Sequence, residues 1–448
     1  MFSFRYSILV FTVFALLMTG CVPPQDPSAN QPPSNVANGN TNTAPAANTQ
    51  PVDQTARNAA LPVTMPLLDA MFQDEAFAEE AKTSVRLTDE ELAKIRDAAR
   101  NAVLQLDSEV ADDERSTRAS VEKTQKAIEA IIGPQRTAEF FNLIRTRWGG
   151  DGELTTGRPN SIPTDTRIVI NAPAFRMDLF NNGQLVKTYK IGIGYPEFPL
   201  PVGLRKAEEI IFNPTWTPPD EPWVKGKVQP GKKVEAGSKL NPLGPIKIPI
   251  GLPSLIHGGK DPSRLGTFAS HGCVGLTSPM VQEFAVDLAS LTGSTLTAED
   301  VKNYAKQKTE TKEVDLAQPV PVELRYETIV VQDGKVYIYR DVYEKGTNTE
   351  ENLRKVLEVY GVTLESLSEQ ERSQLMDAIE QMAVDAQGDA VTGNGNVNSN
   401  SNSANSNSGK VTRNIKGKKE IAVDVAALRG KGYPAPASMP SDTKKGQR

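Results

Sequence analysis

The chain has 448 residues, a net charge of −5 and 38% hydrophobic residues, which is below the usual share for a globular protein. This charge balance excludes a nucleic-acid-binding protein that works through overall positive charge. The sequence contains two cysteines and two histidines, which excludes a disulfide scaffold and a Cys/His-rich zinc module. Each of these four residues can therefore be considered individually.

The first 21 residues have the features of an export signal. Arg5 precedes an apolar run that is shorter than the about 20 residues of a membrane-spanning helix. The run ends in Leu-Met-Thr-Gly-Cys at 17–21, which resembles a bacterial lipobox. The resemblance implies that 1–20 are a lipoprotein signal peptide and that Cys21 is lipidated. The alternative is an ordinary signal peptide with a chance cysteine.

Lipidation of Cys21 would leave Cys273 as the single thiol of an exported protein. An exported thiol without a disulfide partner predicts a use for it. We therefore expect a membrane-anchored lipoprotein that faces the periplasm and the cell wall, with a functional cysteine at 273.

Two segments precede the main domain. Residues 21–61 are rich in Pro, Asn, Ala, Thr and Gln, and they predict a disordered tether. Residues 62–150 predict a helical region with a packing or spacing role. Its clearest signals are a capping box, Thr88-x-x-Glu91, and a helix stop at Gly133-Pro134.

The hydrophobic period changes to two from Arg167 onward, which predicts strands. Asn181-Asn182-Gly183 predicts a hairpin turn, and a single prominent helix is expected over 279–293. Further strands are expected at 320–326, 328–331 and 336–339. The fold class is predicted as α+β, with a mainly-β catalytic domain over 167–345, sandwich-like or barrel-like, flanked by helical segments and disordered linkers.

The C-terminal part of the chain consists of three segments that differ in composition. Residues 350–388 predict a helical segment that is broken near Gly361, and 393–409 are a low-complexity linker of Asn, Ser and Gly. The segment 393–448 ends in a basic tail. This tail either contacts anionic wall polymers or lipid headgroups, or is a disordered solubilising end.

The most informative stretch is Ser-His-Gly-Cys-Val-Gly-Leu at 270–276. Cys273 follows a glycine at the expected start of a helix, where backbone N–H groups lower a thiol pKa and can hold an oxyanion. His257, in an Ile-His-Gly sequence sixteen residues upstream, is the expected base, and His271 is the second candidate for that role. Two competing interpretations of Cys273 are a buried structural thiol and a ligand of a zinc site that includes both histidines.

Five motifs, in this order, resemble the L,D-transpeptidase family with its YkuD-type domain, over about 167–345. They are Pro-Val-Gly at 201–203, Asn-Pro-Thr-Trp-Thr-Pro-Pro at 213–219, Asn-Pro-Leu-Gly at 241–244, His-Gly at 257–258 together with the cysteine motif, and Pro-Val-Pro-Val at 319–322 followed by Asp-Val-Tyr at 341–343. The resemblance implies an acyltransferase with a cysteine nucleophile that acts on peptidoglycan stem peptides, in cell-wall cross-linking or remodelling. It implies no metal and no organic cofactor.

The resemblance also implies the roles of individual residues. Cys273 would form a thioester with the stem peptide and His257 would accept and return the proton, oriented by the Gly258 carbonyl. The backbone amides of His271, Gly272 and Cys273 would form the oxyanion hole. Trp216, Ser270 and Arg264 are the expected substrate-binding residues, although Trp216 is also compatible with a place in the core.

One position departs from the family pattern. Many members have arginine two residues after the cysteine, where this chain has Gly275. The departure leaves substrate anchoring open, and Arg264 is the candidate replacement. The competing functions are an L,D-carboxypeptidase or amidase of the same fold and a non-catalytic wall-binding lipoprotein. The resemblance also implies that a carbapenem, the β-lactam class that acylates this family's cysteine, would modify Cys273.

Overall fold

The computed structural model describes residues 62–106, 117–149, 158–218, 224, 228–251, 254–388, 390–391 and 414–437. The predicted signal peptide, Cys21, the whole of the predicted tether and the low-complexity linker lie outside the described residues. Among the described residues, no helix combines the length and the apolar character needed to cross a membrane.

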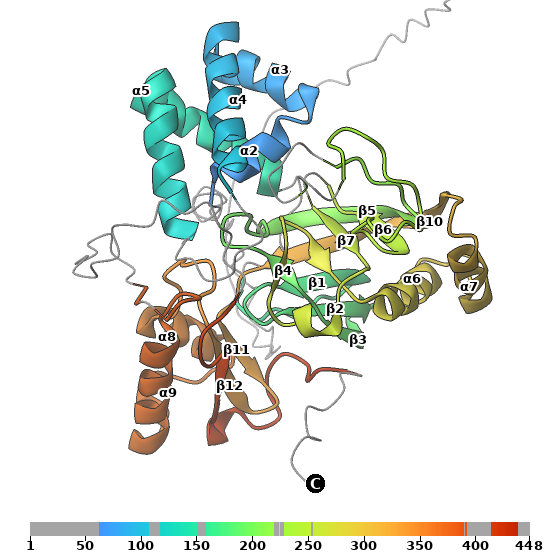
Figure 1. Ribbon diagram of the computed structural model, residues 1–448. Coiled ribbons are helices and arrows are strands. Elements are labelled where there is room, and N and C mark those ends of the chain that lie inside the picture. Colours follow the sequence, from blue (N-terminus) through green and yellow to red (C-terminus); the bar gives the residue numbers. More distant parts are fainter. Residues whose placement is uncertain are drawn as a thin grey trace, which may run out of the picture. The chain divides into compact units, whose positions relative to one another are not determined.

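Residues 65–149 form helices with a hydrophobic core of their own (Figure 1). The helices are α2 (Met65–Met71), α3 (Glu75–Val85), α4 (Asp89–Leu104) and α5 (Thr117–Gly149). The predicted capping box is confirmed: the Thr88 side chain accepts from the Glu91 amide at 3.2 Å, and the Glu91 carboxylate accepts from the Thr88 amide at 3.0 Å. The helix break at Gly133 is also confirmed, since this residue has φ 78° and ψ 163° inside α5.

Glu91 makes the helical region sensitive to acid. Hydrogen bonds from Arg136, at 2.6 and 3.0 Å, and the capping contact with Thr88 lower the pKa of Glu91 to about 2. A carboxyl whose pKa is lowered by folding stabilises the fold above its unfolded pKa of about 4.3, and this stabilisation is lost as the pH falls toward 2. We expect Glu91→Gln to unfold at a lower temperature than the wild type at pH 6 and at nearly the same temperature at pH 2.5, as followed by far-UV circular dichroism. An equal difference at both pH values would contradict this assignment.

The main sheet has eight strands in the order β3-β2-β1-β10-β5-β6-β7-β9 and curls into a half-barrel (Figure 1). The strands are β1 (Arg167–Asn171), β2 (Arg176–Asn181), β3 (Gln184–Lys190), β5 (Gly203–Phe212), β6 (Ile246–Pro249), β7 (Leu255–His257), β9 (Val274–Gly275) and β10 (Lys312–Arg325). The pairs β1–β10 and β7–β9 are parallel, and the other pairs are antiparallel. A second, two-stranded sheet joins β4 (Ile193–Gly194) to β8 (Phe268–Ser270). The predicted α+β class is confirmed.

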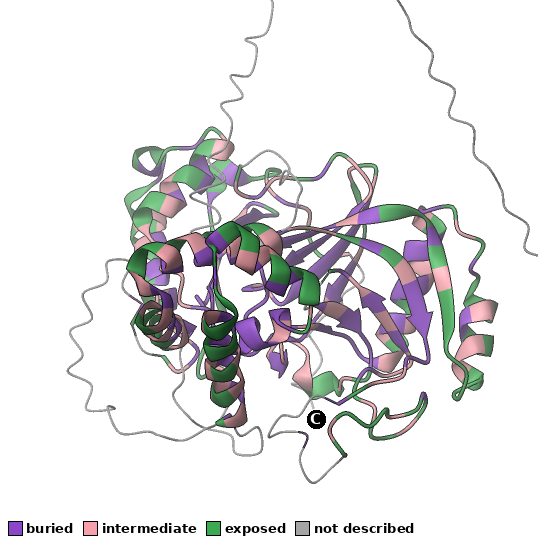
Figure 2. Cartoon of the chain, turned by 90° about the horizontal axis from the view of Figure 1, so that it is seen from above, coloured by how far each residue is buried: buried purple, intermediate pink, exposed green. Residues whose placement is uncertain are grey.

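Apolar side chains from the sheet and from α6 (Ser278–Leu291) make up the core of this domain. Val281, Phe284 and Leu288 lie on one face of α6 and are fully buried, and the strands of the sheet are largely buried as well (Figure 2). A second helix, α7 (Ala298–Lys306), follows α6 and contacts it. The prominent helix predicted over 279–293 is confirmed as α6, whereas α7, which is short and buries only Val301 along its face, was not predicted.

The strands β11 (Ile329–Gln332) and β12 (Lys335–Tyr339) do not join the main sheet. They pair with β13 (Glu420–Asp424) in a three-stranded sheet that contacts α8 (Glu350–Val359) and α9 (Glu369–Met382) and has its own core. The predicted catalytic domain, 167–345, therefore includes two strands that pair in this second sheet and not in the main one. The break between α8 and α9 at Gly361, which has φ 69°, is as predicted.

The basic tail is ordered over 414–437, which corrects the prediction of a disordered end. The reason is that Val423, Val425 and Leu428 are buried in the small C-terminal core, while Asp424 and the two alanines between them are exposed. Beyond this strand, the Ala437 carbonyl accepts from the Thr188 amide at 2.9 Å, so the tail also reaches β3 of the main sheet. The net charge of the tail concealed this apolar pattern.

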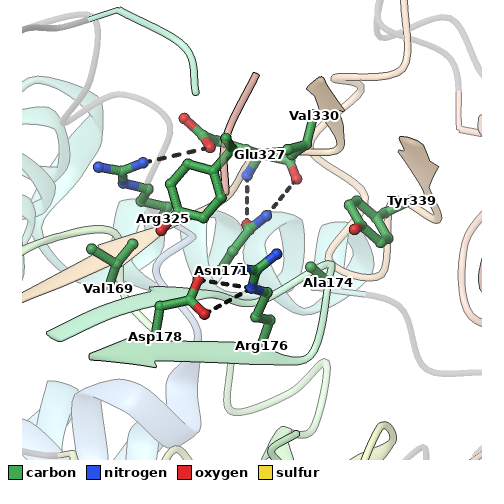
Figure 3. A pocket seen from close by; sticks show the side chains of 10 residues that line it. Val169, Asn171, Ala174, Arg176, Asp178, Arg325, Glu327, Val330 and Tyr339 are labelled. Atoms are coloured by element: carbon green, nitrogen blue, oxygen red, sulfur yellow. Dashed lines mark hydrogen bonds and ion pairs between the residues drawn. The ribbon is translucent and has the colours of Figure 1, made fainter. Parts of the chain in front are cut away.

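The tail also closes a polar pocket beside β1 and β2, which is shown in Figure 3. Tyr433 lines the pocket, with its ring 5.1 Å from the guanidinium of Arg176 and 5.9 Å from that of Arg325. Arg176 in turn pairs with Asp178 at 2.7 Å inside the pocket. The remaining lining residues are Val169, Asn171, Ala174, Glu327, Val330 and Tyr339.

Candidate active site

Sheet pairing brings the two predicted catalytic residues to neighbouring strands. His257 ends β7, and Cys273 directly precedes β9. These strands are parallel neighbours, with Ile256 opposite Val274 and His257 opposite Gly275. Although the two residues are sixteen positions apart in sequence, the intervening loop thus returns the cysteine to the strand next to the histidine.

The imidazole of His257 is held from its Nδ1 side. Nδ1 lies 2.8 Å from the Gly258 carbonyl oxygen, and because a carbonyl only accepts, this contact places the ring proton on Nδ1. Burial first, and then the positive charge of Lys260, lower the pKa of His257 to about 3, against hydrogen bonds to the backbone of Gly258 and Leu243. The ring is therefore neutral at physiological pH and carries an unprotonated Nε2.

Gly258 has a packing reason to be glycine. A Cβ at this position would lie 2.6 Å from Cγ1 of Val281 on α6 and 3.1 Å from Cδ of Pro245. The absence of a side chain lets the backbone pass under α6 and present its carbonyl to the histidine ring. The His-Gly pair thus couples the orientation of the imidazole to the position of α6.

Cys273 is partly exposed and lies in a tight turn between β8 and β9. Its amide donates to Ser270 Oγ at 3.0 Å, and Ser270 Oγ donates to the Cys273 carbonyl at 2.5 Å. Ser254 Oγ donates to the Gly272 carbonyl at 2.8 Å, and Gly272 has φ 92°. The prediction that Cys273 starts a helix is wrong, because α6 begins only at Ser278 and the turn is held by serine side chains instead.

The thiol also differs from the prediction in its acidity. Burial raises the pKa of Cys273, while a hydrogen bond from the backbone of Leu255 and the charge of Lys260 act in the opposite direction with smaller effect. The predicted lowering of the thiol pKa is therefore wrong. The resting pair is a neutral thiol beside a neutral imidazole, so a proton must move when the sulfur attacks.

The backbone amides of the turn are not equivalent. The Cys273 amide donates to Ser270 Oγ in the resting state, so it would have to leave this acceptor in order to take its expected place in the oxyanion hole. The Gly272 amide has no acceptor within the described part of the chain. The ring of His271 packs edge-on against the rings of Tyr195, at 5.0 Å, and Phe198, at 4.8 Å. This aromatic packing gives the His271 side chain a different role from that of His257.

The expected substrate-binding residues fall at three different places. Ser270 holds the turn, as described. Trp216 lies on the long excursion between β5 and β6, where its backbone exchanges two hydrogen bonds with Val234, at 2.7 and 3.0 Å. Arg264 ends a short 3₁₀ helix (Pro262–Arg264) and donates to the Phe268 carbonyl. Nothing in these contacts brings the three side chains together.

Lys260 is a residue of the site that the sequence reasoning missed. Its Nζ donates to the Ala269 carbonyl at 2.8 Å, and its charge acts on both His257 and Cys273. The available signal was a lysine inside the loop between the His-Gly and Ser-His-Gly-Cys motifs. Among the residues the structure describes, no group of three or more His, Cys, Asp or Glu side chains is arranged to hold a metal ion.

Solved structures of L,D-transpeptidases show similarity to this chain. The avibactam carbamoyl enzyme of Ldtfm is 17% identical, with 36% of this chain and 49% of that chain covered and a TM-score of 0.23. The catalytic domain of the E. faecium enzyme is 16% identical, with 37% and 100% covered and a TM-score of 0.22. The Mycobacterium smegmatis enzyme is 15% identical, with 36% and 58% covered and a TM-score of 0.21. The chain thus spans about half the length of the first and third of these.

No curated protein matches the sequence. The family model of the YkuD L,D-transpeptidase catalytic domain matches residues 165–306. The matched segment begins just before β1, ends at the last residue of α7, and contains both His257 and Cys273. Residues 165–306 of this chain are therefore a YkuD-family L,D-transpeptidase catalytic domain.

Proposed function

We propose that this domain is a peptidoglycan L,D-transpeptidase with Cys273 as its nucleophile and His257 as its general base. The observation that carries the proposal is the β7–β9 pairing, which sets the thiol-bearing turn beside a histidine whose Nδ1 is fixed by the Gly258 carbonyl. Covalent catalysis by cysteine needs a nucleophile, a base that accepts its proton, and a third group that orients the base.

In the first step, the sulfur of Cys273 attacks the carbonyl carbon after the third residue of a stem peptide. His257 Nε2 takes the thiol proton as the carbon–sulfur bond forms. The same proton passes to the nitrogen of the leaving D-amino acid as the carbon–nitrogen bond breaks. The products are a thioester on Cys273 and a free D-amino acid, and the imidazole is neutral again.

In the second step, an acceptor amine attacks the thioester, with His257 taking its proton and returning it to the sulfur. The acceptor is the side-chain amine of a second stem peptide in wall cross-linking. A pKa of about 3 keeps His257 in its base form over the physiological range. Water in place of the amine would give the carboxypeptidase reaction.

The oxyanion of each tetrahedral intermediate needs donors near Cys273. The Gly272 amide, which has no acceptor among the described residues, is the first donor we assign. The Cys273 amide is the second, provided that it exchanges Ser270 Oγ for the oxyanion. Ser270 thereby has a part in the resting geometry rather than in substrate binding.

Incubation of the purified chain with a tetrapeptide stem and a diamino-acid-containing acceptor peptide tests the proposal. Mass spectrometry should detect a cross-linked product together with the released D-amino acid, and both should be absent with Cys273→Ala. Release of the D-amino acid without a cross-link would identify a carboxypeptidase. Binding to peptidoglycan without either product would identify a non-catalytic wall-binding lipoprotein.

We further propose that the protein is an exported lipoprotein anchored through Cys21, a residue outside the described part of the chain. We expect Cys21→Ser to move the protein from the membrane fraction to the soluble envelope fraction while the reaction with stem peptides persists. Cell fractionation with immunoblotting measures this, and membrane partitioning of the Cys21→Ser protein would contradict the anchor. The basic residues of the tail remain a proposed contact for anionic wall polymers.

A further inference from the structure

The side chain of Lys260 fills the space above Gly275. A Cβ at position 275 would lie 2.7 Å from Cγ of Lys260 and 2.8 Å from its Cε. Real Cβ atoms do not approach other carbon atoms this closely, so the path of the lysine depends on the glycine. Gly275 is also the strand partner of His257, which places the crossing lysine directly beside the catalytic pair.

Lys260 connects the two ends of the segment that carries the nucleophile. Its backbone amide donates to the Leu276 carbonyl at 3.0 Å, and its Nζ donates to the Ala269 carbonyl at 2.8 Å. Cys273 lies between these two anchor points. The half-buried lysine therefore spans the turn from one side to the other and holds its ammonium group against it.

No acidic side chain of the described residues pairs with this ammonium. The charged and titratable groups that act on Lys260 are Cys273, which raises its pKa, and Arg264, which lowers it, while His257 feels its charge in return. Burial has the largest effect and lowers the pKa of Lys260 to about 8. A thiolate is thus the available anionic partner for Lys260.

We propose that Lys260 is a positioning residue of the active site, which crosses Gly275, fixes the turn of Cys273 and supplies the positive charge that stabilises the thiolate. Lys260 and Gly275 form a matched pair: the glycine makes room, and the lysine places a cation where a long side chain at 275 would otherwise lie. The inference rests on the proposed role of Cys273 as the nucleophile. The test therefore measures the thiol alone, so that the two proposals fail separately.

The test is alkylation by iodoacetamide of the full chain carrying Cys21→Ser, in which Cys273 is the single thiol. Between pH 6.5 and 7.5 Lys260 is protonated, and removal of a neighbouring cation raises a thiol pKa by about one unit. Lys260→Met should therefore react about tenfold more slowly there. Above pH 9 the wild-type lysine is neutral, so the difference should disappear.

Lys260→Arg is the matched control, because a guanidinium keeps its charge at high pH. This variant should react faster than Lys260→Met at pH 7 and also at pH 9.5. A rate difference between the wild type and Lys260→Met that is the same at every pH would indicate a purely structural effect and would overturn the proposal. Equal alkylation rates for the wild type and Lys260→Met at pH 7 would overturn the proposal as well.

The matched pair has its own test. Gly275→Ala should displace the lysine and reduce alkylation at pH 7 toward the level of Lys260→Met. In Lys260→Ala/Gly275→Arg, a long cation from position 275 takes the vacated space, so alkylation at pH 7 should recover relative to Lys260→Ala. If the double variant is no faster than Lys260→Ala, or if Gly275→Ala reacts like the wild type, the pair is not matched.

Discussion

One covalent equivalent of a carbapenem such as imipenem should bind to the full chain carrying Cys21→Ser, and none should bind after the further change Cys273→Ala. The sulfur attacks the β-lactam carbonyl as it would attack a stem peptide, and opening of the ring retains the whole molecule on the enzyme. Intact-protein mass spectrometry measures the adduct. In His257→Ala, acylation should be slower by roughly 10²–10⁴-fold, the usual contribution of a general base.

The pKa values of Cys273 and His257 determine how the rate of this acylation depends on pH. A depressed thiol pKa would produce a preformed thiolate at pH 6, but burial raises the pKa of Cys273. Acylation instead requires the neutral imidazole of His257, whose pKa of about 3 leaves it unprotonated throughout the range. We therefore expect the acylation rate to change little between pH 5 and pH 8 and to fall only as the pH approaches 3.

The variants should retain their fold, because neither side chain is part of the hydrophobic core. Thermal midpoints of Cys273→Ala and His257→Ala within a few degrees of the wild type are the control. An adduct on folded Cys273→Ala, or none on the folded parent chain, would overturn the assignment of the nucleophile and leave the wall-binding function. The protein used must retain 414–437, since these residues belong to the fold.

The order of motifs along the sequence indicated His257 and Cys273 as the candidate catalytic pair, and the structure brings the two residues to the neighbouring strands β7 and β9. The environment of those residues was not predictable in the same way. Whether a thiol pKa rises or falls depends on burial, on the amide that reaches the sulfur and on the cation that lies nearby, and all three come from outside the motif. The place of Lys260 in the site depends on the pairing of β7 with β9 and on the missing side chain of Gly275, whose space the lysine fills.

The C-terminal errors have a similar origin. β10 ends at Arg325 and β11 begins at Ile329, so both give one continuous period-two pattern although they belong to different sheets. The strand that completes the second sheet lies some eighty residues further on, in a tail whose lysines dominate its composition. Long-range pairing of this kind leaves no local signal, whereas the capping box at Thr88 and the turn at Gly183 are local and were predicted.

Loss of the Arg176 guanidinium should destabilise the protein by about 3–5 kcal/mol, because it leaves a buried carboxylate without its cation. Arg176 and Asp178 face each other in Figure 3 and are 5% and 2% exposed. Thr188 Oγ donates to the same carboxylate at 2.6 Å. In Arg176→Met, the Asp178 carboxylate keeps its hydrogen bond from the Thr188 hydroxyl but loses the positive charge of the guanidinium. Chemical denaturation at pH 8 measures the loss in the free energy of unfolding.

Two variants separate this buried pair from ordinary ion pairs. Arg176→Met/Asp178→Leu removes both charges and should recover much of the lost stability, as buried pairs replaced by apolar side chains commonly do. Lys335→Met breaks an exposed pair with Asp424, whose side chain is 83% exposed, and should cost less than about 1 kcal/mol. Equal losses for Arg176→Met and Lys335→Met would contradict the role of burial.

The same arginine also ties the C-terminal tail to the catalytic domain. Its Nη2 donates to the Pro434 carbonyl at 2.9 Å, and its guanidinium lies against the ring of Tyr433. Arg176→Met should therefore speed proteolytic cleavage within 414–437 before the rest of the chain is attacked. Because burial raises the pKa of Asp178, the unpaired carboxyl takes up a proton as the pH falls, so the destabilisation should be smaller at pH 4.5 than at pH 8. A loss of stability that is independent of pH would show that the missing charge is not its cause.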